Sequence, residues 1–443
     1  MQKFAEGFLL GAATAAHQVE GNNTNSDFWA MEHMKSGGFI EPSGNAVDQY
    51  HRYEEDITYM EQAGLNAYRF SIEWARIEPQ EGVFDEREMQ HYMDGIACCK
   101  AHGLEPIVTL HHFSSPKWLI SKGGWEAPST PDDFEEYVRY VISHIGSEVQ
   151  YICTINEANM GLQVASVAKK IIMQMMAAKA AQQGVSASDS EGQIQMGINL
   201  DQIMKSVASK GADENMAVFG VERLETFTYM RSEAGDRLIM QAHMQARKAI
   251  KETYPDIRVG LTLSLPDLQA CEGGEAAAAK QWDEDFSHYL PYIQDDDFLG
   301  VQNYTRSLMG PDGQLPNPEG AELTQMDYEF YPEALGNVLR KVAKEFKGDL
   351  IVTENGIATS DDTRRVEFIR RALEGVQGCI ADGVPVKGYM YWSLLDNFEW
   401  QKGYSMTFGL IAVDRSTQVR TLKPSLAFLG TYAKKSGIQQ RTV

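Results

Sequence analysis

Two short segments of the sequence each place a glutamate directly after an apolar run. Glu157 ends the segment Thr154-Ile-Asn-Glu157, and Glu354 lies within Val352-Thr-Glu-Asn-Gly356. Such runs are typical of buried parallel strands, and a (β/α)8 barrel carries its catalytic groups at the carboxyl ends of its strands. Two carboxylates at that face would suit cleavage of a glycosidic bond. One can protonate the leaving oxygen while the other stabilises or attacks the anomeric carbon.

The alternative is a surface role, since the chain has 62 acidic residues and a glutamate at a strand end is often only a salt-bridge partner. The neighbouring residues favour catalysis. Asn156 could hydrogen-bond a sugar hydroxyl, and Gly356 would permit a tight backbone turn after Glu354. We therefore interpret Glu157 and Glu354 as a catalytic pair.

The order of elements along the chain predicts the scaffold that positions this pair. Apolar runs alternate with helix-like stretches, which favours a parallel sheet. The predicted strands are Phe8–Ala13, Ala67–Ile72, Pro106–Leu110, Tyr151–Ile155, Arg258–Leu263, Phe298–Gln302, Leu350–Thr353 and Lys387–Trp392. The predicted helices are Tyr53–Gly64, Glu88–Gly103, Pro131–Ile145, Gly235–Thr253, Pro332–Phe346 and Ser360–Gly383. Because eight repeats favour closure and no linker divides the chain, we expect an α/β fold, a single (β/α)8 TIM barrel over residues 1–443.

The amino-acid composition limits the kinds of partner and the cellular compartment that we expect for the chain. The formal net charge of −22 argues against nucleic acid as a partner and predicts little attraction to anionic membranes. Five scattered cysteines read as reduced thiols of a cytoplasmic protein. The apolar segment Phe8–Ala16 is better explained as a first barrel strand than as a secretion signal, and no stretch is apolar enough to span a membrane. The sequence leaves open whether the chain forms a homo-oligomer.

Residue types that bind sugars recur at the predicted strand ends. Trp392 and Trp400 could form a stacking platform for a pyranose ring, whose C–H faces pack on indole, although core packing would explain either one alone. His111 and His112 could suggest a metal, but adjacent residues of a strand point to opposite faces. We therefore expect no metal and no cofactor.

At this point the residues match a known family. The chain resembles glycoside hydrolase family 1, the β-glucosidase family of retaining enzymes on a (β/α)8 barrel. The matching segments run in family order and are Gly11-Ala-Ala-Thr-Ala-Ala-His-Gln-Val-Glu-Gly21, Asp48-Gln-Tyr-His-Arg-Tyr-Glu-Glu-Asp56, Tyr68-Arg-Phe-Ser-Ile-Glu-Trp74, Thr109-Leu-His-His-Phe113, Thr154-Ile-Asn-Glu-Ala-Asn159, Val352-Thr-Glu-Asn-Gly356 and Tyr391-Trp-Ser-Leu-Leu-Asp-Asn-Phe-Glu-Trp400.

The resemblance implies Glu157 as acid/base and Glu354 as nucleophile, with Arg69 and Tyr304 holding the nucleophile ionised and oriented. An arginine beside Glu354 should depress the pKa of its carboxyl, whereas the pKa of Glu157 must be higher so that it starts protonated. The implied substrate-binding residues are Gln18, His112, Asn156, Trp392, Glu399, Trp400 and Phe408.

The sequence departs from the family pattern at Gln302, where asparagine is usual, at His17, where tyrosine is common, and at Phe113, where tryptophan is common. These departures bear on sugar choice rather than on mechanism. The branch that acts on 6-phosphorylated sugars lacks the carboxylate of Glu399 and has Lys and Tyr where Met406 and Phe408 stand here. An unphosphorylated glycone is therefore expected, because Glu399 would repel a phosphate.

The stretch from Gly161 to about Leu224 is unlike the family pattern, and ten of the twenty methionines lie between Met160 and Met244. This stretch could be a helix that faces the core, or, together with Met160, an apolar wall on the aglycone side of the site.

The sequence thus predicts a retaining exo-β-glycosidase acting on a small β-glycoside, with β-glucosidase favoured. A β-galactosidase, a β-fucosidase and a transglycosylase are alternatives within the same chemistry. A non-catalytic sugar-binding relative is a remote one, since both glutamates are present.

Overall fold

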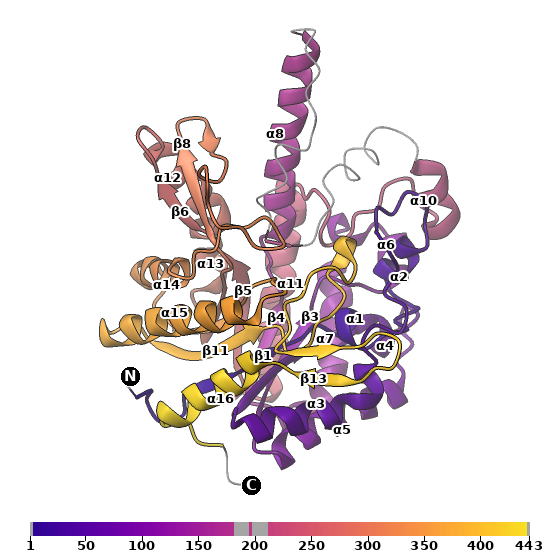
Figure 1. Cartoon of the computed structure of the whole chain (residues 1–443). Helices are drawn as coiled ribbons and strands as arrows, with labels where there is room; N and C mark the ends of the chain where they lie inside the picture. The colour runs from indigo at the N-terminus through magenta and orange to yellow at the C-terminus, as the bar shows by residue number, and fades with distance from the viewer. Residues whose placement is uncertain (1–2, 181–194, 197–210, 441–443) are drawn as a thin grey trace.

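Eight parallel strands close into a barrel in the computed structural model, which describes residues 3–180, 195–196 and 211–440 (Figure 1). In order around the barrel they are β1 (Leu9–Ala13), β2 (Ala67–Ser71), β3 (Glu105–His111), β4 (Tyr151–Ile155), β5 (Arg258–Ser264), β7 (Phe298–Gln302), β10 (Asp349–Asn355) and β11 (Val386–Trp392), which pairs with β1. The eight predicted strands are confirmed, each boundary to within two residues.

The strands are buried along nearly their whole length, because helices cover the outside of the barrel and side chains fill its interior. The six predicted helices are confirmed, and α16 is an addition at the chain end. The covering helices are α3 (Gln49–Ala63), α5 (Glu86–Ala101), α7 (Thr130–Ile145), α11 (Glu233–Thr253), α14 (Ala334–Glu345), α15 (Asp362–Ala381) and α16 (Pro424–Lys435).

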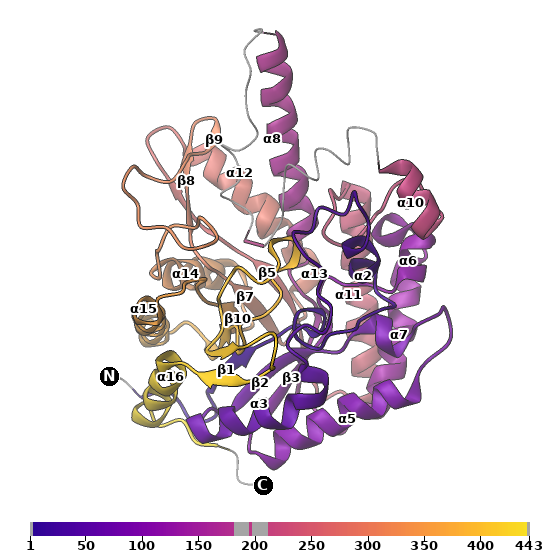
Figure 2. The same ribbon diagram turned by 45° about the vertical axis from the view of Figure 1, so that its right-hand side comes forward.

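Longer insertions gather where the loops leave the carboxyl ends of the strands. α8 (Met160–Ala180) follows β4 and projects well beyond the barrel, and a small sheet of β6 (Asp267–Ala270), β8 (Arg306–Gly310) and β9 (Gly313–Gln314) lies near it with α12 (Glu275–Asp285), as both views show (Figures 1 and 2). The stretch that contains α8 was expected to diverge, with a helix as one interpretation. The small sheet and α12 were not predicted, because they lack the strand-and-helix alternation of the barrel.

The remaining elements are short connections within the loops. They are α1 (Ala16–Val19), α2 (Asp27–Glu32), α4 (Trp74–Ile77), α6 (Lys117–Ser121), η1 (Gly124–Glu126), α10 (Ala212–Phe219), η4 (Ser287–Tyr289), α13 (Leu290–Ile293), η5 (Trp400–Lys402), and the hairpin of β12 (Ile411–Val413) and β13 (Arg420–Leu422). Within the described part of the chain, no helix has the length and apolar character needed to cross a membrane.

Candidate active site

Glu354 lies near the end of β10, buried, and both of its carboxylate oxygens accept hydrogen bonds. Oε1 accepts from Arg69 Nη1 at 2.6 Å and from Gln302 Nε2 at 2.9 Å, and Oε2 accepts from Tyr304 Oη at 2.5 Å. Arg69 comes from β2, whereas Gln302 and Tyr304 come from the end of β7 and the residues after it. Closure of the barrel brings these three donors together, and Gln302 makes direct contact although it replaces the usual asparagine.

Glu157 follows β4 and is 2% exposed, and its backbone N–H donates to Thr262 Oγ1 at 2.9 Å. Among the described residues, no lysine, arginine or histidine forms an ion pair with it, in contrast to Glu354, which pairs with Arg69. One carboxylate is therefore neutralised by a cation and the other is not.

This difference separates the pKa values of the two carboxyls. Burial, and next the negative charge of Glu354, hold the pKa of Glu157 well above its usual range. Burial also raises the pKa of Glu354, but the Arg69 guanidinium and the Tyr304 phenol oppose that rise. The expected depression of the pKa of Glu354 is therefore wrong as a net direction, because desolvation outweighs the cation. The pKa of Glu157 is nevertheless raised more than that of Glu354, so the proton binds to Glu157, as an acid and nucleophile pair requires.

Asn156 lies at the centre of a hydrogen-bond network that spans the barrel mouth. Its Oδ1 accepts from Arg69 Nη2 at 2.6 Å and from Gln302 Nε2 at 2.7 Å, and its Nδ2 lies 3.2 Å from His112 Nε2. Burial, followed by the charge of Arg69, keeps the pKa of His112 well below its usual value. The imidazole is therefore neutral and can exchange hydrogen bonds with a neutral ligand.

Aromatic rings form one side of the site. The ring of His112 lies 5.6 Å from that of Trp392 and 6.2 Å from that of Trp400, nearly parallel to both. Phe408 packs edge-on against Tyr304 at 6.0 Å and belongs to the same buried cluster as Trp392. These rings supply apolar faces of the kind on which a pyranose ring stacks.

Gln18, on α1, lies beside Glu399 in this site. Its Nε2 donates to the carbonyl oxygen of Phe398 at 2.7 Å and lies 3.4 Å from Glu399 Oε2. The chain therefore brings Gln18 and Glu399 together from segments far apart in the sequence.

Several buried polar atoms around the site have no hydrogen-bond partner within the part of the chain that the structure describes. They are Gln18 Oε1, Arg69 Nε, His112 Nδ1 and Gln302 Oε1. Buried polar atoms in native proteins are nearly always paired, so a cluster of unpaired ones points to a hydroxyl-rich ligand. Acceptors and donors are both present, as a sugar requires.

Three residues of the site have left-handed backbone angles that are unusual without glycine: Glu157 (φ 44°), Phe113 (φ 68°) and Trp400 (φ 46°). Such conformations cost about 1–3 kcal/mol each and concentrate at functional sites.

Gly356 was expected to permit a tight turn after Glu354, but the structure gives it another role. A Cβ at this position would lie 1.8 Å from the carbonyl oxygen of Trp392, so the glycine allows β10 and β11 to approach beside Glu354.

Met160 is not placed as expected, whereas His111 is. Met160, considered as an aglycone wall, is fully buried in the main hydrophobic core, and the side chains of residues 173–180 lie outside the described residues. His111 turns away from His112 to bond Ser115 Oγ at 3.0 Å. Among the described residues, no group of histidines, cysteines and carboxylates could hold a metal ion.

Sequence reasoning missed Gln195 and Tyr328. Gln195 is buried, and its Oε1 accepts from the backbone N–H of Tyr304 at 2.7 Å. Tyr328 is also buried, and after burial the charges of Glu399 and Glu157 raise its pKa well above the usual value, which places it close to both carboxylates. Both residues lie in irregular loops without a periodic pattern, so no signal in the sequence pointed to either.

Comparison with known proteins agrees with the resemblance found in the sequence motifs. The model of glycosyl hydrolase family 1 matches residues 1–178 and 285–438. A solved beta-glycosidase structure shares 42% identity with a TM-score of 0.84, and the match covers 99% of each chain. Beta-glucosidase A of Thermotoga maritima is 29% identical over 99% of both chains, and a 6-phospho-beta-galactosidase of Lacticaseibacillus casei is 30% identical over 96% of both.

Proposed function

The chain belongs to glycosyl hydrolase family 1, and from that premise we propose that it is a retaining exo-β-glucosidase that removes a terminal unphosphorylated β-D-glucosyl residue. The observation that carries this proposal is the pairing of two buried carboxyls in different states. Glu354 is bonded to Arg69, Gln302 and Tyr304, whereas Glu157 has a high pKa that keeps its proton. This is the acid and nucleophile pair that retaining hydrolysis uses.

In the first step, Glu157 donates its proton to the glycosidic oxygen while the carboxylate of Glu354 attacks the anomeric carbon. The bond from that carbon to the leaving oxygen breaks, and a glycosyl ester of Glu354 forms. Arg69 and Tyr304 keep the nucleophile ionised and fix the orientation of its oxygens before the attack, so little reorganisation is needed in the transition state.

In the second step, Glu157 acts as a base. Once Glu354 is esterified it carries no charge, so the repulsion that raised the pKa of Glu157 is lost and that pKa falls. Glu157 can then take a proton from water, which attacks the anomeric carbon and releases the sugar with its configuration retained.

Glycone binding is assigned to the residues that surround this pair. Gln18, His112 and Asn156 would exchange hydrogen bonds with sugar hydroxyls, Glu399 would accept from them, and Trp392, Trp400 and Phe408 would enclose the ring. The similarity to a 6-phospho-beta-galactosidase raises a phosphorylated glycone as a second candidate. Glu399 argues against it, because its carboxylate would repel a phosphate.

A panel of 4-nitrophenyl β-D-glycosides tests this assignment. We expect the glucoside to be hydrolysed with a higher kcat/KM than the galactoside and the fucoside, and the 6-phosphoglucoside to be the poorest substrate. Preference for the 6-phosphoglucoside would contradict the role given to Glu399. Analysis of products with added alcohol separates hydrolysis from transglycosylation, which uses the same glycosyl-enzyme.

We propose further that residues 1–443 act as one catalytic domain, whose divergent segment at about 161–224 lies near the aglycone side. A cytoplasmic location is supported by the five cysteines, all of which are free thiols. Sedimentation analysis will show whether the protein forms a homo-oligomer.

A further inference from the structure

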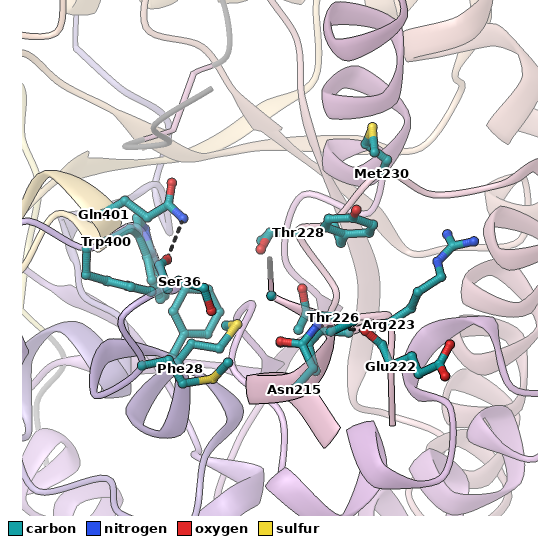
Figure 3. Close-up of a pocket in the computed structure, with 18 of the residues that line it drawn as sticks. Phe28, Ser36, Asn215, Glu222, Arg223, Thr226, Thr228, Met230, Trp400 and Gln401 are labelled. Carbon is teal, nitrogen blue, oxygen red and sulfur yellow. Dashed lines mark hydrogen bonds between the residues drawn. The ribbon is translucent and has the colours of Figure 1, made fainter. Parts of the chain in front are cut away.

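A pocket of about 490 Å³ is lined by Trp400, which it shares with the glycone residues, and by other residues that were not assigned above. Trp400 and Gln401 form one side, and Thr228 and Met230 face them across the opening, with Phe28 and Asn215 below (Figure 3). The volume is in the range of pockets that hold small organic ligands.

Thioethers and aromatic rings form much of the lining. They belong to Phe28, Met31, Met34, Phe39, Met196, Tyr229, Met230 and Trp400. Methionine side chains are flexible and polarizable, so a wall made of several of them can fit apolar groups of different shapes.

Four of the polar side chains in the lining already have protein partners. Ser36 Oγ donates to Glu214 at 2.7 Å, Asn215 Nδ2 to the carbonyl oxygen of Glu222 at 2.8 Å, and Gln401 Nε2 to that of Gly37 at 3.4 Å, while Arg223 pairs with Glu225 at 3.0 Å. Glu222, Thr226 and Thr228 also line the pocket. A ligand with many hydroxyls would have to displace the first four contacts, whereas an apolar ligand leaves them in place.

The position of the pocket identifies which part of a substrate could reach it. One wall continues directly from Glu399 through Trp400. The opposite wall, residues 226–230, is followed by Arg231, which donates from its side chain to the carbonyl oxygen of Ala158 and from its backbone to that of Gly161 at 3.2 Å. The pocket therefore shares Trp400 with the glycone residues, and its opposite wall is bonded through Arg231 to the turn that carries Glu157, which is the side from which the protonated leaving group departs.

We infer that this pocket is the aglycone site and that it takes an extended apolar alcohol, such as an alkyl, aryl or terpenoid group, in preference to a second glucose. The inference rests on the proposed function, since it assigns the leaving-group side of the same reaction. It replaces the expectation that Met160 forms this wall, because Met160 is not among the residues that line the pocket.

The unmodified protein provides the first test. Binding of n-alkyl 1-thio-β-D-glucosides from methyl to octyl, measured by calorimetry, should tighten about threefold per methylene until the pocket is filled, since burial of one CH₂ group supplies a factor of that order. The kcat/KM values of the matching O-glucosides should rise in parallel, and octyl β-D-glucoside should exceed cellobiose.

Two variants locate the effect. Met31→Gln and Met230→Gln keep the side-chain length but place an amide in opposite walls of the pocket, and each should lower the octyl-to-methyl ratio of kcat/KM about tenfold. Met216→Gln is the matched control, because Met216 lies in nearby α10, is 47% exposed and is not part of the pocket lining. Met216→Gln should leave the kcat/KM values of both glucosides unchanged, and in Met31→Gln and Met230→Gln the octyl glucoside should lose more activity than the methyl glucoside.

The possible outcomes distinguish failure of the pocket assignment from failure of the proposed β-glucosidase function. A flat series of thioglucoside affinities, or a preference for cellobiose, overturns the apolar pocket even if glucosides are hydrolysed well. Affinities that tighten with chain length in a protein that hydrolyses no glucoside would uphold the pocket and overturn the proposed function.

Discussion

The side-chain oxygen of Gln195 accepts a 2.7 Å hydrogen bond from the backbone N–H of Tyr304. Tyr304 in turn holds Glu354, so a residue outside the segments that match the family model supports a residue of the catalytic core. Loss of the Gln195 acceptor would leave a buried N–H without a partner, which costs about 1–3 kcal/mol. The divergent part of the chain therefore contacts a residue that binds the proposed nucleophile.

Hydrolysis should retain the anomeric configuration. The carboxyl groups of Glu157 and Glu354 should lie roughly 5 Å apart, against about 6.5–9.5 Å in inverting enzymes. Proton NMR recorded during the first turnovers of a β-glucoside should show β-glucose before mutarotation. Initial release of α-glucose would rule out the covalent mechanism.

Glu354→Gly should abolish hydrolysis, because no carboxylate remains to attack. The same variant should couple α-glucosyl fluoride to an acceptor sugar, since the vacated space accommodates a donor that resembles the glycosyl-enzyme and Glu157 can still act as base. Chromatography of the products checks this outcome. Residual hydrolysis equal to that of the unmodified enzyme would show that another residue is the nucleophile.

Glu157→Ala should distinguish substrates by their leaving groups. A 4-nitrophenolate departs without protonation, so its glucoside should retain far more activity than a methyl glucoside, which needs the proton. The ratio of the two kcat/KM values measures the effect. An equal loss for both substrates would mean that Glu157 is not the general acid.

Tyr304→Phe should move the acidic limb of the kcat/KM pH profile to higher pH. The phenol lowers the pKa of Glu354, and without it the carboxyl binds its proton more tightly and ionises only at higher pH. The lost hydrogen bond to a charged group should also reduce kcat/KM about 10- to 100-fold. Tyr137→Phe is a control, since the Tyr137 phenol bonds two backbone carbonyls away from Glu354. A profile of unchanged shape in Tyr304→Phe would contradict the contact.

Asp27→Asn should stabilise the protein at neutral and alkaline pH but not at acid pH. Burial raises the pKa of Asp27 from 3.8 to about 7, against the opposing effect of two backbone N–H groups. The folded state thus holds this proton more tightly than the unfolded state. Its contribution to stability is complete below pH 4 and is lost as the pH rises through 7, by ~4 kcal/mol at most. Thermal unfolding at pH 4, 6 and 8 should show a difference that grows with pH.

The strands and the position of Glu157 and Glu354 at the strand ends could be predicted because both depend on local sequence. Apolar runs such as Leu350–Thr353 form strands wherever both faces are buried, and a glutamate that follows such a strand lies at the barrel mouth whatever the loops do. The contact of Gln302 with Glu354 could not be predicted, because it depends on side-chain reach across two neighbouring strands. The direction of the Glu354 pKa was missed because sequence reveals the cation but not the depth of burial.

The backbone hydrogen bond between Arg231 and Gly161 has an evolutionary consequence. A Cβ on Gly161 would lie 2.8 Å from the Arg231 guanidinium, so the chain leaves the barrel and returns to it through one closely fitted junction. Lengthening a loop whose ends are already held together costs little free energy. Insertions and exchanges between these two positions that keep Gln195 in contact with Tyr304 can therefore be accommodated while the frame of the two carboxylates is inherited intact. Lineages of this enzyme could diversify in the alcohols they release and still share one way of breaking the bond.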